Sequence, residues 1–95
     1  MREMKSSKLD PIGRLLLPAE IRTPLGLNVG DKLYATPSPD GKTVLLQKQQ
    51  TPNATGVTID NLGRVTLPKA LFDAMSVSSG DTITLVPSND GINLM

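Results

Sequence analysis

Residues 10–18 read DPIGRLLLP, and residues 60–68 read DNLGRVTLP. Sliding the chain by 50 places without a gap extends this match to eleven identities in 45 aligned positions. The identical pairs are Asp10 with Asp60, Gly13 with Gly63, Arg14 with Arg64, Leu17 with Leu67, Pro18 with Pro68, Gly30 with Gly80, Asp31 with Asp81, Pro37 with Pro87, Ser38 with Ser88, Asp40 with Asp90 and Gly41 with Gly91. An ungapped match of this length predicts an internal duplication.

Each copy has the pattern of two short strands, a short helix and two more strands. Gly13 and its counterpart 50 residues later close a turn, where glycine accepts a positive φ. Pro18 fits the first position of a helix, which needs no N–H donor. Pro24 removes a helical hydrogen bond, so the first helix is expected to end or bend there. The run Leu15–Leu17 is apolar throughout, which predicts a strand buried on both faces.

Asp-Gly pairs at 40–41 and 90–91 predict hairpins between the last two strands of each copy. A unit of about 45 residues is too small to bury its apolar face alone. We therefore expect a mostly β fold with two short helices, in which two ββαββ repeats share one core. The predicted organisation is an N-terminal tail at 1–7, repeat 1 at 8–48, a linker at 49–56 and repeat 2 at 57–95. A monomeric pseudo-dimer and an exchanged homodimer both remain open.

The composition excludes several function classes. The 95 residues include no Cys, no His and no Trp. Disulfides, thiolate or imidazole metal sites, a cysteine nucleophile and a histidine base are therefore impossible, so we expect no enzymatic activity, no cofactor and no metal. No apolar run approaches the 18 residues or so of a membrane span, and the N-terminus lacks a signal-peptide pattern, so we expect a cytoplasmic protein without a membrane partner.

Positive charge is concentrated in one half of the sequence. The whole chain has ten Lys and Arg against nine Asp and Glu, a net charge of +1. The first half, residues 1–48, has eight basic and five acidic residues, which gives +3; the second half, residues 49–95, has two and four, which gives −2. A surface that attracts an anionic partner is therefore expected mainly on the first half.

The repeated motif Asp-x-x-Gly-Arg-(Leu/Val)-x-Leu-Pro resembles the SpoVT/AbrB family. In the first copy it is followed by Ile21-Arg22, Leu25-Gly26-Leu27 and Gly30-Asp31, and the two copies span roughly residues 8 to 95. The resemblance implies a swapped-hairpin AbrB-like barrel and a role as a prokaryotic transcriptional regulator that binds double-stranded DNA. Three features depart from the family pattern: one short chain carries both copies, which in the family normally come from two chains, and two positions differ in residue type. Pro24 lies within the first helix, and Phe72 stands where the first copy has Arg22.

The resemblance and the charge distribution together suggest the residues that contact DNA. They are Arg14, Arg64, Arg22, Lys8, Lys5 and Lys69, with Arg2 beside them. Arginine and lysine neutralise phosphates, and a guanidinium can also donate two hydrogen bonds to guanine. These residues could instead have structural roles. Arg14 and Arg64 could pair with Asp10 and Asp60 to hold the turns, and the N-terminal cations could belong to a mobile tail.

Two other functions remain open. The first is an antitoxin-like or protein-interaction module of the same fold, similar to MazE, which would bind a toxin or another protein. The second is a duplicated scaffold that binds nothing strongly, a reading favoured by the near-neutral net charge.

Overall fold

The computed structural model describes residues 4–89 and 91–95. Within these ranges the fold is mostly β, with eight strands and two short α-helices, as predicted. The first half contains β1 (Lys5–Lys8), β2 (Arg14–Leu16), α1 (Ala19–Arg22), the 3₁₀-helix η1 (Thr23–Leu25), β3 (Lys32–Pro37) and β4 (Val44–Gln47). The second half contains β5 (Thr55–Thr58), β6 (Arg64–Thr66), α2 (Lys69–Met75), β7 (Thr82–Pro87) and β8 (Gly91–Leu94).

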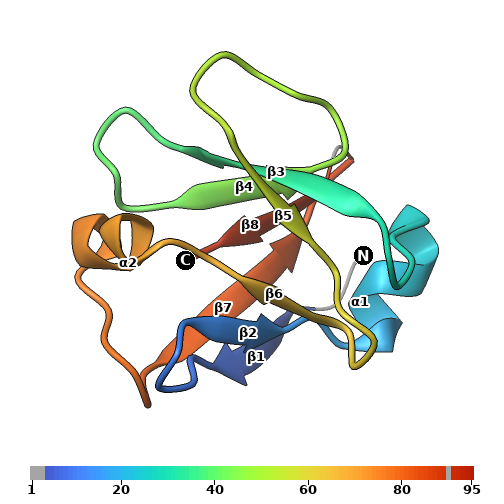
Figure 1. The fold of residues 1–95 in the computed structure, drawn as a ribbon, viewed down its shortest axis with the longest axis horizontal. Helices are drawn as coiled ribbons and strands as arrows, with labels where there is room; N and C mark the ends of the chain where they lie inside the picture. The colour runs from blue at the N-terminus through green and yellow to red at the C-terminus, as the bar shows by residue number, and fades with distance from the viewer. Residues whose placement is uncertain (1–3, 90) are drawn as a thin grey trace.

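The strands of the two halves interleave (Figure 1). One sheet has the order β1-β7-β8-β4-β3-β5, and a second, two-stranded sheet pairs β2 with β6. Each outer strand of the large sheet therefore pairs with the opposite half: β1 with β7, and β5 with β3. If β1, β3 and β4 are exchanged with their counterparts β5, β7 and β8, the same strand order results, read from the other edge. The strand pairing therefore has an approximate twofold symmetry.

The core lies between the β2–β6 ribbon and the large sheet. Leu15 and Val65 face each other across the ribbon, and both are fully buried. They join one apolar cluster with residues of the large sheet such as Leu46 and Ile83. The prediction that β2 is buried on both faces is wrong, because Leu16 is 45% exposed. A two-stranded ribbon covers the core with one face and leaves its other face open.

Pro24 has the effect that the sequence predicted. The first helix ends after four residues, and the chain continues as the 3₁₀-helix η1, which has Pro24 in its first turn. Gly26 then caps η1 with a φ of 70°. In the second half, without a proline at the equivalent place, α2 runs for seven residues. No helix in the described part of the chain is long and apolar enough to cross a membrane.

Two predicted boundaries need correction. β1 begins at Lys5, within the range 1–7 assigned to a tail, and β5 begins at Thr55, within the range 49–56 assigned to a linker. The two strands read KSSK and TGVT, and they lie at the two edges of the large sheet. An edge strand is held by backbone hydrogen bonds to one neighbouring strand. Its sequence therefore shows little of the alternation of apolar and polar residues by which a half-buried strand is recognised.

The two halves of the chain differ at their final hairpins. In the first half Ala35 faces Leu46, eleven residues later, whereas in the second half Leu85 faces Leu94, nine residues later. The second hairpin is therefore two residues shorter. Gly41, in the first hairpin's turn, has a φ of 74°, whereas Gly91 lies in β8 and is buried. The sequence match of these two glycines does not reflect equivalent positions; Asp90, beside Gly91, lies outside the described residues.

Candidate nucleic-acid interface

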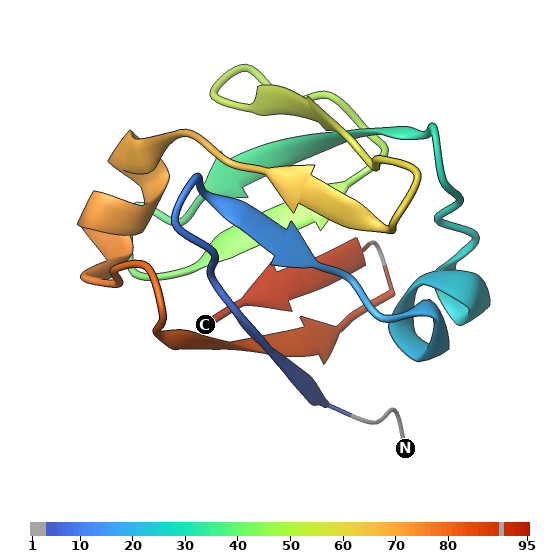
Figure 2. The same cartoon turned by 60° about the horizontal axis from the view of Figure 1, so that its bottom comes forward.

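The exposed side of the β2–β6 ribbon brings the two repeated arginines onto one surface. Arg14 lies opposite Thr66, and Leu16 lies opposite Arg64. Since side chains alternate along a strand, these four share the side that faces away from the core. We call them the ribbon face. Figure 2 shows β2 and β6 side by side, with α2 and α1 at opposite ends of the ribbon.

Each arginine follows a turn that an aspartate holds in shape. Oδ1 of Asp10 accepts hydrogen bonds from the backbone N–H of Ile12, at 3.0 Å, and from that of Arg14, at 2.7 Å. Asp60 makes the equivalent bonds in the second turn, both at 2.9 Å. An aspartate that binds backbone N–H groups in this way fixes the turn. The repeated Asp-x-x-Gly-Arg sequence thus places both arginines at the start of a ribbon strand.

The same aspartates pair with the arginine side chains. Nε of Arg14 donates to Oδ2 of Asp10, and Nε of Arg64 donates to Oδ2 of Asp60 at 3.0 Å. These are the ion pairs expected if the two arginines hold the turns in shape. The two arginine side chains remain 34% and 27% exposed. A guanidinium has five N–H donors, so its Nη groups retain donors for a second acceptor such as a phosphate. Structural pairing and DNA contact are therefore compatible.

The turn aspartates are expected to make folding stability depend on pH. Burial raises the pKa of Asp10, but hydrogen bonds from Arg14 and Ile12 outweigh it and bring the pKa below the ordinary value of an aspartate. The backbone N–H of Arg64 is the largest influence on Asp60 and lowers its pKa as well. A carboxyl whose pKa is lower in the folded state stabilises the protein above the unfolded value and loses that contribution as pH falls.

We therefore expect the urea midpoint to fall as the pH drops below about 4. The double variant Asp10→Asn/Asp60→Asn should be less stable at neutral pH and should lose less of its remaining stability on acidification. Urea unfolding from about pH 7 to about pH 2.5 measures both effects. An acid dependence as steep in the double variant as in the wild type would show that these turns do not contribute to it.

Arg22, which was also predicted to contact DNA, lies outside the ribbon face and binds backbone carbonyls. Its Nε donates to the carbonyl oxygen of Leu17 at 2.6 Å, and Nη1 donates to that of Leu27 at 3.5 Å. Its guanidinium also packs on Gly63, where an added Cβ would lie 3.1 Å from Nη2. Arg22 thus connects α1 to the second turn. The sequence could not show this, because the acceptors are backbone carbonyls that only the fold brings together.

The predicted lysines are distributed over other elements. Nζ of Lys5 forms an ion pair with Oε2 of Glu20 at 2.8 Å, so Lys5 connects β1 to α1 instead of lying in a tail. Lys8 is exposed at the end of β1, just before the first turn. Lys69 is exposed at the start of α2. Arg2 lies outside the described residues. Of these cations, Lys8 lies closest in sequence to an arginine-bearing turn.

Exposed apolar side chains accompany the arginines, and the sequence interpretation missed them. Ile12 is 64% exposed and Leu62 is 67% exposed, each within one of the two turns. With Leu16, they give this side of the molecule an apolar component. One sequence feature could have revealed this exposure. Each residue lies between the aspartate and the glycine of its turn, where a side chain points away from the turn.

No group of three or more metal-ligand side chains occurs among residues 4–89 and 91–95. No protein-family model matches the chain, and no curated protein matches it either. Among solved structures, the chain is similar to the solution structure of PHS018 from Pyrococcus horikoshii, with a TM-score of 0.59. The two are 21% identical, and the match covers 97% of this chain and 87% of that chain. This likeness concerns the fold alone.

Proposed function

We propose that the protein is a DNA-binding transcriptional regulator of the SpoVT/AbrB kind, without enzymatic activity. In this proposal the two halves form a swapped-hairpin barrel, and the ribbon face docks on the duplex. One observation carries the proposal: the β2–β6 ribbon places Arg14 and Arg64 at symmetric positions on a single exposed surface.

The shape of the ribbon suits the major groove, which admits a two-stranded β-ribbon. The approximate twofold symmetry of the ribbon matches the symmetry of a duplex, so each arginine-bearing turn can meet an equivalent part of one strand. The arginines can then contact phosphates or donate to the O6 and N7 atoms of guanine. Because a single chain supplies both turns, a monomer is sufficient for this mode of binding.

Charge makes the proposed binding modest and sensitive to salt. Asp10 and Asp60 pair with the two arginines, so the ribbon face carries less positive potential than its arginines alone would give. Lys8, exposed before the first turn, adds a third cation near this surface. Two or three neutralised phosphates correspond to a slope of about −2 to −3 when the logarithm of the association constant is plotted against the logarithm of salt concentration.

Fluorescence anisotropy of a labelled duplex, titrated at salt concentrations between roughly 50 and 200 mM, measures this slope. We expect a clear fall in affinity across the range for a mixed-sequence duplex, along a straight line on this logarithmic plot. Affinity that does not change with salt, or the absence of binding even at the lowest salt, would contradict the proposal.

A protein-interaction module similar to MazE is the second candidate function. It is favoured by the exposure of Ile12 and Leu62 in the turns, since apolar side chains at a surface often mark protein contacts. The double variant Ile12→Ser/Leu62→Ser distinguishes the two functions. A DNA regulator keeps the wild-type salt slope in this variant, because that slope depends on cations. A protein that fails to bind duplex DNA but loses a co-purifying host toxin on this substitution would instead be an antitoxin.

A further inference from the structure

Half of the exposed large apolar side chains in the described part of the chain lie on the ribbon side of the molecule. Six such side chains are at least 45% exposed, and Ile12, Leu16 and Leu62 are three of them. The other three belong to other places in the fold: Met4 before β1, Val29 before β3 and Met95 after β8. Single exposed apolar residues are ordinary, whereas a group of them on one surface points to a contact.

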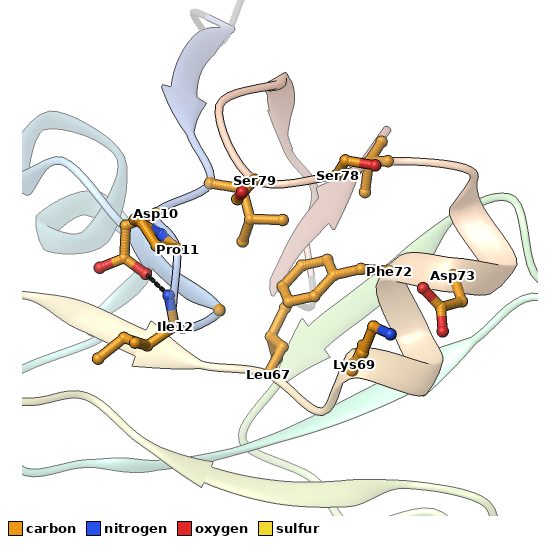
Figure 3. A pocket seen from close by; sticks show the side chains of 12 residues that line it. Asp10, Pro11, Ile12, Leu67, Lys69, Phe72, Asp73, Ser78 and Ser79 are labelled. Atoms are coloured by element: carbon orange, nitrogen blue, oxygen red, sulfur yellow. Dashed lines mark hydrogen bonds between the residues drawn. The ribbon is translucent and has the colours of Figure 1, made fainter.

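The two turns hold their apolar side chains in equivalent and fixed positions. Ile12 and Leu62 are 50 residues apart, and each donates its backbone N–H to the aspartate of its turn, at 3.0 Å to Asp10 and 2.9 Å to Asp60. Figure 3 shows the bond between Ile12 and Asp10, with the Ile12 side chain directed away from the ring of Phe72. The backbone that carries each side chain is therefore ordered before any ligand arrives, which lowers the cost of binding.

These apolar side chains accompany the arginines of the ribbon face. Ile12 lies two residues before Arg14, and Leu62 lies two residues before Arg64. Leu16 lies across the ribbon from Arg64. Each guanidinium thus has at least one exposed aliphatic neighbour on the same side of the molecule.

Contact with phosphates alone gives such aliphatic side chains no role, since phosphate and sugar oxygens require hydrogen-bond donors. In the major groove, by contrast, the edge of thymine presents its C5-methyl group, which protein side chains contact through apolar groups. The base 5-methylcytosine presents the same methyl group at the same ring position. An arginine beside an aliphatic side chain therefore matches a base edge that can accept hydrogen bonds beside one that carries a methyl group.

We propose that Ile12 and Leu62 are specificity-determining residues that contact the C5-methyl groups of pyrimidines in the major groove. Each reads a methyl group next to the bases or phosphates that the arginine of the same turn contacts, and Leu16 enlarges the apolar surface beside Arg64. This inference rests on the proposed function and goes beyond it, because it names the chemical group that the turns recognise.

Replacing thymine by deoxyuridine removes the methyl group and leaves the hydrogen-bonding pattern of the base unchanged. Burial of one methyl group against an apolar side chain corresponds to about a fourfold change in affinity. With one methyl group at each turn, we expect about a tenfold loss when all thymines of a duplex become deoxyuridine. Fluorescence anisotropy measures this loss on two duplexes of the same mixed sequence, in which every second base pair is A·T.

A third duplex of that sequence, with every cytosine replaced by 5-methylcytosine, distinguishes the two sources of the methyl group. Weaker binding of the deoxyuridine duplex identifies thymine as a source. Tighter binding of the third duplex than of the thymine duplex identifies 5-methylcytosine as a source. Equal binding of all three duplexes by the wild-type protein would overturn the inference.

Variants separate a contact with the protein from an effect of deoxyuridine on the duplex itself. Ile12→Ala/Leu62→Ala is expected to bind the thymine and deoxyuridine duplexes with equal affinity and to keep the wild-type salt slope. Met95→Ala is the matched control, because Met95 is a similarly exposed apolar residue, 57% exposed, after β8 in the large sheet. It should keep the full preference for thymine. Both variants change exposed side chains, so their urea midpoints should stay near that of the wild type.

The outcomes distinguish this inference from the proposed function. If no duplex binds at the lowest salt concentration, the proposed function fails, and this inference fails with it. If the thymine duplex binds with the expected salt dependence but Ile12→Ala/Leu62→Ala keeps the full preference for thymine, DNA binding stands and the role of the two turn residues is refuted.

Discussion

The double variant Arg14→Gln/Arg64→Gln is expected to lose about a hundredfold in duplex affinity, and each single variant roughly tenfold. The reason lies in the ribbon, which puts the two guanidiniums at symmetric positions on one surface. If the two turns make equivalent contacts with the duplex, the two single losses should be similar and should add. Glutamine keeps most of the side-chain length but removes the charge that binds a phosphate.

The fold should survive these substitutions. Each one removes a partly exposed ion pair with Asp10 or Asp60, and such pairs contribute little to stability. The bonds from the backbone N–H groups to the aspartate Oδ1 atoms remain. The matched control is Lys42→Gln/Lys48→Gln, which changes the net charge equally at exposed positions around β4. A loss of affinity as large in the control as in the arginine variant would mean that net charge, and not the ribbon face, determines binding.

Gly91→Ala is expected to destabilise the protein by about 3 kcal/mol or more. A Cβ added at this position would lie 1.9 Å from the carbonyl oxygen of Leu46 and 2.9 Å from its carbonyl carbon. Both atoms belong to the backbone of β4, which cannot rotate away as a side chain can. β8 pairs with both β4 and β7, so a shift of β8 would disturb the centre of the large sheet.

Gly56→Ala is the matched control for this prediction. Gly56 also lies in a strand, and an alanine there would approach the Cε of Lys32 at 2.6 Å. That atom is near the end of a flexible, exposed side chain, so the change should cost less than about 1 kcal/mol. Urea unfolding of both variants gives the comparison. Similar midpoints for the two would contradict the close packing of β8 against β4.

The local structure of the turns could be predicted from the sequence, because short-range chemistry determines it. Asp10 and Gly13 specify a turn through bonds between neighbours, and Pro24 ends α1 by its own geometry. The burial of Leu15 likewise follows from its place in the apolar run Leu15–Leu17. The exposure of Leu16 could not be predicted from that run, since it depends on the outer face of the β2–β6 ribbon being left open to solvent.

Features that depend on distant parts of the chain escaped prediction for the same reason. Arg22 looked like a free cation on a short helix, but its acceptors and Gly63 reach it only through the interleaving of the halves. The equivalence of Gly41 and Gly91 looked secure from an identical Asp-Gly pair. The strand register shows that the second hairpin is two residues shorter, so the two glycines have different roles.

Mapping of the duplex contact by ¹H–¹⁵N NMR tests the central claim most directly. The claim is that DNA docks on the exposed side of the β2–β6 ribbon. We expect a duplex to shift the amides of Arg14, Leu16, Arg64 and Thr66, with little change at the edge formed by β1. Shifts concentrated on α1 and β1, with these four amides unmoved, would contradict the account.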